Sequence, residues 1–145
     1  MENEMLDRPL RILLADDSVD NRLLVLNYLR NTPYRVDEAE NGKTAIEKFC
    51  LMHYDLVLMD IQMPEMEGYE ATRAIRHWER EHGRPRTPII ALTAAALQEN
   101  KRRTREAGCD LHVTKPVKRA TLLSAIRDAV LGAPAAELDA RSREA

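Results

Sequence analysis

The sequence alternates between short runs of strand length and longer stretches in which apolar residues recur at helical spacing. Strand-like runs occupy 10–15, 34–39, 56–59, 88–92 and 111–113. Helical spacing covers 19–30, a stretch from 43 to about 50, 71–78 with a stop near Gly83, 94–107, and 122–130 with a stop at Gly132. Alternation of this kind, with mostly apolar strands, predicts a doubly wound α/β domain: a five-stranded parallel sheet with helices on both faces.

Composition narrows the functional classes. Hydrophobic residues make up 44% of the 145 residues and charged residues 32%, so the chain can form a core and lacks the composition of a disordered protein. Its 22 basic and 24 acidic residues give a net charge of −2, which provides no basic field for nucleic acid or an anionic membrane. No signal-peptide core or membrane-spanning run is present, and the two cysteines lack metal-ligand spacing. We therefore expect a cytosolic protein.

Polar residues follow the predicted strands at Asp16, Asp17, Asp60, Thr93 and Lys115. Ligands bind beyond the carboxyl ends of strands in an open parallel sheet, so these side chains are expected to converge. A helix N-cap is the alternative for Asp17 or Thr93 taken singly. Three carboxylates at one edge need a compensating cation, for which Mg²⁺ is suited. With a lysine and a hydroxyl for phosphate oxygens, the set predicts phosphoryl transfer to an aspartate nucleophile.

Four motifs stand at these strand ends in order: Asp16-Asp17, the stretch LVLMDIQMP at 56–64 followed by Gly68, ALTA at 91–94, and TKP at 114–116. Together they resemble the receiver domain of two-component response regulators, especially receivers of hybrid sensor kinases and phosphorelays. The resemblance covers about 10–131, with 1–9 as an N-terminal extension and 132–145 as a flexible tail. It implies a flavodoxin-like strand order of 2-1-3-4-5 with five helices.

The resemblance also implies roles for individual residues. Asp60 would accept the phosphoryl group. Mg²⁺, or Mn²⁺ in its place, would be held by Asp17 directly, Asp16 largely through water, Asp60, and the backbone carbonyl of Gln62. Phosphoryl oxygens would be held by Thr93, Lys115 and the Ala94 N–H, beside a cis Lys115–Pro116 peptide. Gln62 and Ala95 occupy positions that tune the lifetime of the phosphorylated state. His112 stands where the family usually carries Tyr or Phe, and is either a second switch residue or a partly exposed surface histidine.

The expected function is phosphorelay signalling. The phosphoryl donor would be the phosphohistidine of a sensor histidine kinase or phosphotransfer domain, and phosphorylation would change the surface around the helix after Thr93 and the last helix. We expect a downstream protein partner, no direct DNA or membrane binding, a possible phosphorylation-dependent homodimer, and catalysis only of the domain's own phosphorylation and dephosphorylation. The chain would be a stand-alone regulator or a receiver from a longer kinase. The alternatives are a Mg²⁺-dependent phosphohydrolase with an aspartyl-phosphate intermediate and a phosphate-independent binding module.

Overall fold

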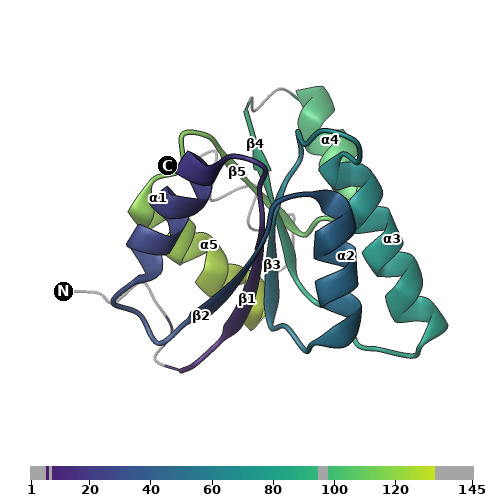
Figure 1. Cartoon of the computed structure of the whole chain (residues 1–145), viewed down its shortest axis with the longest axis horizontal. Coiled ribbons are helices and arrows are strands. Elements are labelled where there is room, and N and C mark those ends of the chain that lie inside the picture. Colours follow the sequence, from purple (N-terminus) through teal and green to yellow (C-terminus); the bar gives the residue numbers. More distant parts are fainter. Residues whose placement is uncertain (1–5, 7, 95–97, 133–145) are drawn as a thin grey trace.

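The computed structural model describes residue 6 and residues 8–94 and 98–132, with only the backbone described at 98–100. Five parallel strands form one sheet in the order β2-β1-β3-β4-β5 (Figure 1). The strands are β1 (Arg11–Ala15), β2 (Arg35–Ala39), β3 (Leu56–Asp60), β4 (Ile89–Thr93) and β5 (Leu111–Thr114). The helices are α1 (Val19–Leu29), α2 (Gly42–Leu51), α3 (Gly68–Glu81), α4 (Gln98–Ala107) and α5 (Arg119–Leu131). The predicted doubly wound sheet is confirmed.

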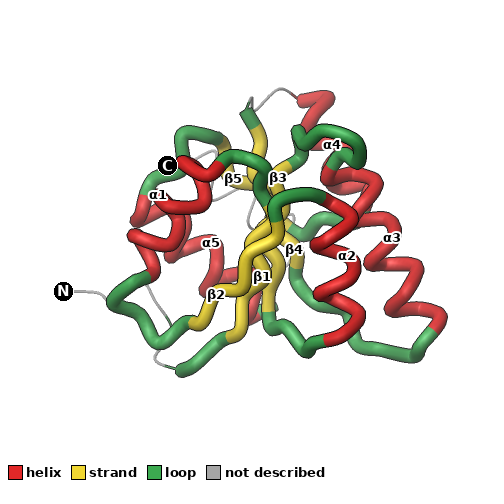
Figure 2. The backbone as a smooth tube through the Cα atoms, viewed as in Figure 1, coloured by secondary structure: helices red, strands yellow, loops and turns green. Residues whose placement is uncertain are grey.

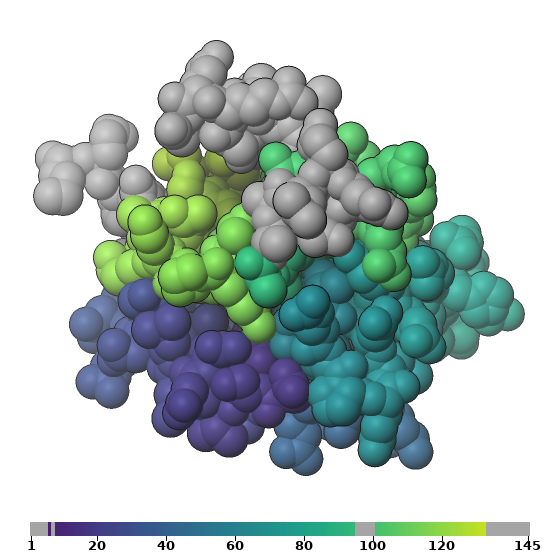
Figure 3. Space-filling view, turned by 90° about the horizontal axis from the view of Figure 1, so that it is seen from above, coloured from purple at the N-terminus to yellow at the C-terminus, as the bar shows by residue number. Residues whose placement is uncertain are grey.

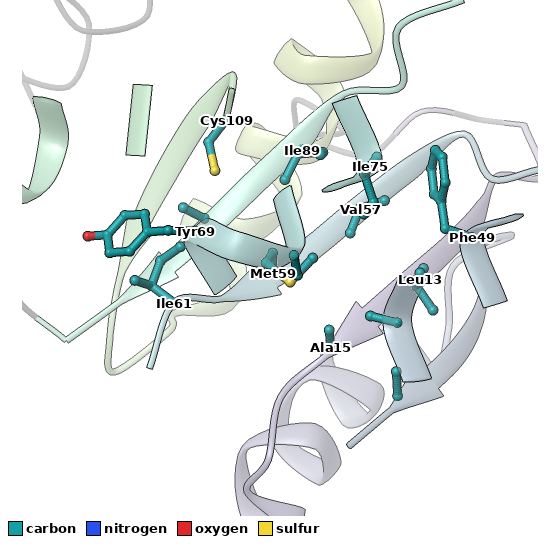
Figure 4. Close-up of a cluster of buried hydrophobic side chains, with 14 of the residues drawn as sticks. Leu13, Ala15, Phe49, Val57, Met59, Ile61, Tyr69, Ile75, Ile89 and Cys109 are labelled. Atoms are coloured by element: carbon teal, nitrogen blue, oxygen red, sulfur yellow. The ribbon is translucent and has the colours of Figure 1, made fainter. Parts of the chain in front are cut away.

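Alternation of side chains along the strands divides the core into two layers. Leu13 of β1 is in register with Val57 of β3, and both pack beneath α2 and α3 (Figure 4). Their neighbours Leu14 and Leu58 point to the opposite face and pack with residues of α1 and α5. Figure 2 shows these helices on the two sides of the sheet. Because both faces are covered, β3 and β4 are buried at every residue and β1 at every residue after Arg11, which explains their continuous apolar runs.

Most predicted element boundaries agree with the structure, and one helix start is wrong. Gly108 and Gly132 follow α4 and α5 with φ angles of 114° and 76°, the positive values expected of glycine at a helix end. The helix expected from Ala94 does not begin there. Ala94 forms a bend after β4, and the described helix starts at Gln98. Alanine has high helix propensity, but the chain leaving β4 is held by β5, where Lys115 N–H donates to Thr93 O at 2.7 Å.

A buried ionic cluster joins α3 to the segments that lead into β4 and β5. The Arg76 side chain is 5% exposed and contacts Glu79 Oε1 at 2.8 Å and Asp110 Oδ2 at 2.9 Å. It also donates to Gly108 O at 2.9 Å and Thr87 O at 2.7 Å. One guanidinium therefore joins α3, the segment before β4 and the turn between α4 and β5, and its four acceptors compensate for its loss of water.

Besides the helix expected at 94–107, of which 95–97 are not described, three predictions fall wholly or partly on residues outside those described. They are the flexible tail, of which 133–145 are not described; the N-terminal extension, of which 1–5 and 7 are not described; and the lifetime role of Ala95. Within the described ranges, no helix combines the length and apolar character needed to cross a bilayer.

Candidate functional site

The carboxyl ends of the strands place the predicted polar residues on one edge of the domain, the upper edge in Figure 1. Asp16 directly follows β1, and its N–H donates to Ala39 O of β2 at 3.0 Å, which extends the sheet ladder by one residue. Asp60 is the last residue of β3, and Lys115 directly follows β5. Figure 3 looks onto this edge, where purple, teal and yellow-green segments from distant parts of the sequence meet. The predicted convergence is therefore confirmed for these three side chains.

Three carboxylates form the centre of the site. Carboxylate oxygens of Asp16, Asp17 and Asp60 lie within 4.8 Å of one another. Asp16 and Asp60 are each 1% exposed, whereas Asp17 is exposed. The N-cap alternative for Asp17 is wrong, because the Ser18 side chain accepts the hydrogen bond from Asn21 N–H at 3.2 Å that caps α1. Asp17 is therefore left facing solvent beside two buried acids.

Lys115 partly compensates this negative charge. Its Nζ donates to Asp60 Oδ1 at 3.0 Å and lies 3.4 Å from Asp16 Oδ2. The Gln62 N–H donates to the same Asp60 Oδ1 at 3.2 Å, and the Ser18 N–H donates to Asp16 Oδ1 at 2.9 Å. Among the described residues, the Oδ2 atoms of Asp16 and Asp60 have no hydrogen-bond partner. Each buried carboxylate thus keeps one oxygen for a ligand.

Burial dominates the electrostatics of Asp60. The pKa of its carboxyl is raised from 3.8 to about 6, mainly by the loss of water and to a smaller extent by the nearby charge of Asp16. The hydrogen bond and positive charge of Lys115 oppose this rise, as does the hydrogen bond from Gln62 N–H. The carboxylate is therefore ionised at neutral pH, but its burial makes the ionised form less stable than it would be in water. A bound cation would offset this loss of stability.

The arrangement fits a hard divalent cation. Two buried carboxylate oxygens lack hydrogen bonds within the described part of the chain, and a third, solvent-facing acid completes the cluster. Mg²⁺ binds one or two protein carboxylates and retains several waters, so a site open on the Asp17 side suits it. Asp16, Asp17 and Asp60 are the side chains that could hold the ion, and the Gln62 carbonyl is close by in the chain.

The remaining predicted site residues lie around this cluster. Thr93 is buried at the end of β4 and pairs in register with Thr114, while Ala94 is exposed just beyond it. The Lys115–Pro116 peptide is cis. His112 is half-buried on β5, in register with Ala91, and lines a small pocket with Thr104 and Arg105 of α4. It therefore lies beneath α4 rather than at the acid cluster.

Gly68 and Arg22 are two further residues that support the site. A Cβ atom on Gly68 would lie 2.3 Å from Asp60 O and 2.8 Å from the Ile61 Cα, so only glycine permits this closeness of α3 and β3. Gly68 N–H also donates to Ile61 O at 2.9 Å. Arg22 of α1 donates from Nη1 to Asp16 O at 2.7 Å. Gly68 belongs to the motif quoted after Pro64, although its closeness to β3 depends on how the elements pack, whereas the Arg22 contact has no spacing or motif from which it could be predicted.

The fold and this edge together define a doubly wound α/β protein of the receiver type. The chain belongs to the response regulator receiver domain family, whose sequence profile matches residues 12–127.

Known relatives and structures agree with this assignment. The chain is 39% identical over 126 residues to the sensor histidine kinase GacS of Pseudomonas protegens, a match that covers 86% of this chain and 14% of that protein. The chain therefore spans only a small part of that relative's length. A receiver domain of a sensor histidine kinase from Pseudomonas aeruginosa PAO1, with a magnesium ion coordinated in its active-site cleft, is 36% identical with a TM-score of 0.77. That alignment covers 86% of this chain and 99% of the other.

A third similarity is to a receiver seen together with its phosphotransfer protein. The Saccharomyces cerevisiae receiver domain of Ssk1, crystallised with the histidine phosphotransfer protein Ypd1, is 27% identical with a TM-score of 0.82. The alignment covers 90% of this chain and 98% of that one. Receivers similar to this chain therefore include one that binds Mg²⁺ and one that contacts a phosphotransfer protein.

Proposed function

We propose that this domain accepts a phosphoryl group onto Asp60 from the phosphohistidine of a sensor histidine kinase or a phosphotransfer protein. The observation that carries the proposal is the state of the Asp60 carboxylate. It is 1% exposed, its Oδ1 is held by Lys115 and Gln62 N–H, and its Oδ2 accepts no hydrogen bond from any described residue. The relation to a receiver crystallised with a phosphotransfer protein supports the choice of donor.

The transfer is a displacement at phosphorus. A carboxylate oxygen of Asp60 forms the new P–O bond while the P–N bond to the donor imidazole breaks, and the bonding pair leaves with the imidazole. Bound Mg²⁺, or Mn²⁺, would neutralise charge on the carboxylates and on the transferred phosphoryl oxygens. Asp16, Asp17, Asp60 and the Gln62 carbonyl are the groups that we propose to hold this cation. Lys115, already 3.0 Å from Asp60 Oδ1, would move its charge to a phosphoryl oxygen.

The phosphorylated side chain would carry a charge of about −1.5 to −2 and three acceptor oxygens. We propose that the Thr93 hydroxyl and the Ala94 N–H bind these oxygens, and that this inward pull changes the packing of α4 on β5. His112 lies beneath α4 and would respond to that change. Gln62 and Ala95 would tune the lifetime of the phosphorylated state. The surface of α4, β5 and α5 would then be read by a downstream protein or by a second copy of the chain.

We further propose that the domain turns over no other substrate, binds neither DNA nor membrane directly, and works in the cytosol. The free thiols of Cys50 and Cys109 suit a reducing compartment. A phosphorylation-dependent homodimer through α4 and α5 can be tested by sedimentation of the phosphorylated and unphosphorylated protein. Equal sedimentation of the two forms would exclude it.

Intact mass spectrometry tests the central proposal. The protein is incubated with acetyl phosphate in the presence and absence of Mg²⁺, alongside Asp60→Asn and the control Asp20→Asn, which alters an exposed acid at the start of α1. We expect one phosphoryl group on the wild type and on the control, and none on Asp60→Asn or without metal. Labelling of Asp60→Asn would contradict the assignment of the acceptor. Absence of label from the wild type, with both acetyl phosphate and a phosphorylated phosphotransfer protein, would contradict the function.

A further inference from the structure

Arg22 on α1 reaches across the edge of the sheet to the backbone of the first buried acid. Its Nη1 donates to Asp16 O at 2.7 Å, and its Nε donates to Glu38 Oε1 on β2 at 3.0 Å. The Arg22 side chain is 13% exposed, a low value for an arginine near a domain surface. Two acceptors on different elements therefore fix both the position and the plane of the guanidinium.

The oxygen that accepts from Arg22 lies between two of the three acids of the site. The Asp16 carbonyl belongs to the peptide unit that joins Asp16 to Asp17, and this unit determines the direction in which Asp17 leaves β1. The Asp16 N–H donates to Ala39 O at 3.0 Å, and the Asp16 Oδ1 accepts from Ser18 N–H at 2.9 Å, a contact that closes a turn across Asp17. Arg22 adds a contact from α1 that holds the carbonyl of the peptide between the two acids.

Asp17 depends on this backbone for its position. It is exposed, and within the described part of the chain its carboxylate forms no hydrogen bond or ion pair, unlike that of Asp16. Rotation of the preceding peptide would carry the Asp17 carboxylate away from the other two acids, with nothing in its own side-chain contacts to oppose the movement. The geometry of the cation site therefore requires a rigid peptide at this point.

We infer that Arg22 is a positioning residue that holds the Asp16–Asp17 peptide and so sets the affinity of the acidic site for its divalent cation. The inference rests on the proposed function in that it takes the acid cluster to be the cation site. Arg22 acts through the backbone of a ligand, as groups that orient metal ligands do in other proteins. It is not expected to contact the phosphoryl group or the nucleophile.

Glu38 supports Arg22 from the far side. Its Oε1 accepts from Arg22 Nε, and its own backbone carbonyl accepts from Lys48 Nζ on α2. The Glu38 side chain is 45% exposed, so its ion pair with Arg22 is weakened by water. We expect Glu38 to orient the guanidinium, while the bond to Asp16 O carries the effect on the cation site. Lysine cannot replace arginine fully, because one ammonium cannot reproduce a planar fork directed at two acceptors.

The test is a comparison of Mg²⁺ affinity among variants of the whole chain, measured by isothermal titration calorimetry without any phosphodonor. Arg22→Met is expected to weaken Mg²⁺ binding about 10-fold, the lower end of the effect of losing a group that orients a metal ligand. Arg22→Lys should fall between Arg22→Met and the wild type, and Glu38→Gln should stay close to the wild type because its amide oxygen still accepts. Arg73→Met, which removes an exposed arginine from α3, is the matched control and should bind Mg²⁺ like the wild type.

Two further measurements distinguish a role of Arg22 in positioning the cation site from a role in stabilising the fold alone. Labelling by acetyl phosphate should be slower for Arg22→Met at limiting Mg²⁺ and should recover the wild-type rate at saturating Mg²⁺, because the nucleophile and Lys115 are unchanged. Urea unfolding of the metal-free protein shows whether the variant is folded at the assay temperature. If Arg22→Met is unfolded, Arg22→Lys alone decides the matter by the same affinity measurement.

Unchanged Mg²⁺ affinity in folded Arg22 variants would overturn the inference, and so would a labelling defect that persists at saturating Mg²⁺. Either result leaves the proposed function intact as long as the wild type is labelled on Asp60. Failure of the wild type to bind Mg²⁺ or to be labelled would instead refute the proposed function.

Discussion

Replacement of Asp60 by asparagine is expected to stabilise the metal-free protein at neutral pH and to change its stability little near pH 3.8. The reason is the burial of this carboxyl, which raises its pKa from 3.8 to about 6 in the folded state. A folded group that binds its proton more tightly than the unfolded chain favours folding at low pH. As pH rises from 3.8 to about 6, the unfolded chain loses this proton first, so the free energy of unfolding falls.

The size of the effect follows from the two pKa values. A difference from 3.8 to about 6, at ~1.36 kcal/mol for each pH unit, amounts to about 3 kcal/mol of lost stability above pH 6. Asparagine resembles the protonated acid and avoids this loss at every pH. A natural domain of ordinary stability unfolds with about 5–15 kcal/mol, so the difference is a readily measured fraction of the total.

Urea unfolding of the wild type and Asp60→Asn, in the presence of a chelator and over a series of pH values, measures this difference. Titrating groups remote from Asp60 affect both proteins alike, so the gap between them reports Asp60 together with its two charged neighbours, Asp16 and Lys115. The gap should grow in favour of the variant as pH rises and become constant above about 6. Added Mg²⁺ should then stabilise the wild type more than the variant, because the variant has lost one ligand. If the difference in unfolding free energy between the two proteins does not change with pH, then ionisation of the buried Asp60 carboxyl does not destabilise the folded protein, and the explanation is refuted.

Two other substitutions test the packing around the site. Arg76→Met should lower the free energy of unfolding by about 3–5 kcal/mol, because it leaves the buried Glu79 carboxylate without its ion-pair partner, while Asp110 keeps its pair with Arg86. The exposed control Arg73→Met should have little effect, and urea unfolding measures both. Gly68→Ala should cost about 1–3 kcal/mol and slow acetyl phosphate labelling, since its Cβ would approach Asp60 O to 2.3 Å and displace the acceptor residue. Gly83→Ala, with open space around the added Cβ, should leave labelling unchanged, and equal labelling rates for the two glycine variants would contradict the steric account.

The agreement between sequence and structure is closest where local pattern and burial coincide. The apolar run at 56–59 predicted a strand of a sheet covered on both faces, and β3 is buried along its whole length. Agreement fails where a packing contact outweighs local propensity. The alanines from Ala94 favour a helix, yet Ala94 forms a bend because the end of β4 is paired with β5. Asp17 suited an N-cap by residue type, yet Ser18 caps α1 and Asp17 is left beside the acids.

The sequence alone determined the class of fold, its family, and the identity of the acids and the lysine at the sheet edge, because periodicity and motif order are local properties of a chain. Only the tertiary structure decided how these groups affect one another. The raised pKa of the Asp60 carboxyl depends on its burial and on its distances to Lys115 and Asp16, and these three residues lie far apart in sequence. The positioning role of Arg22 also depends on the tertiary structure, which brings α1 close to Asp16 O and to Glu38 on β2. Every residue has a backbone carbonyl, so the sequence does not indicate which one Arg22 contacts.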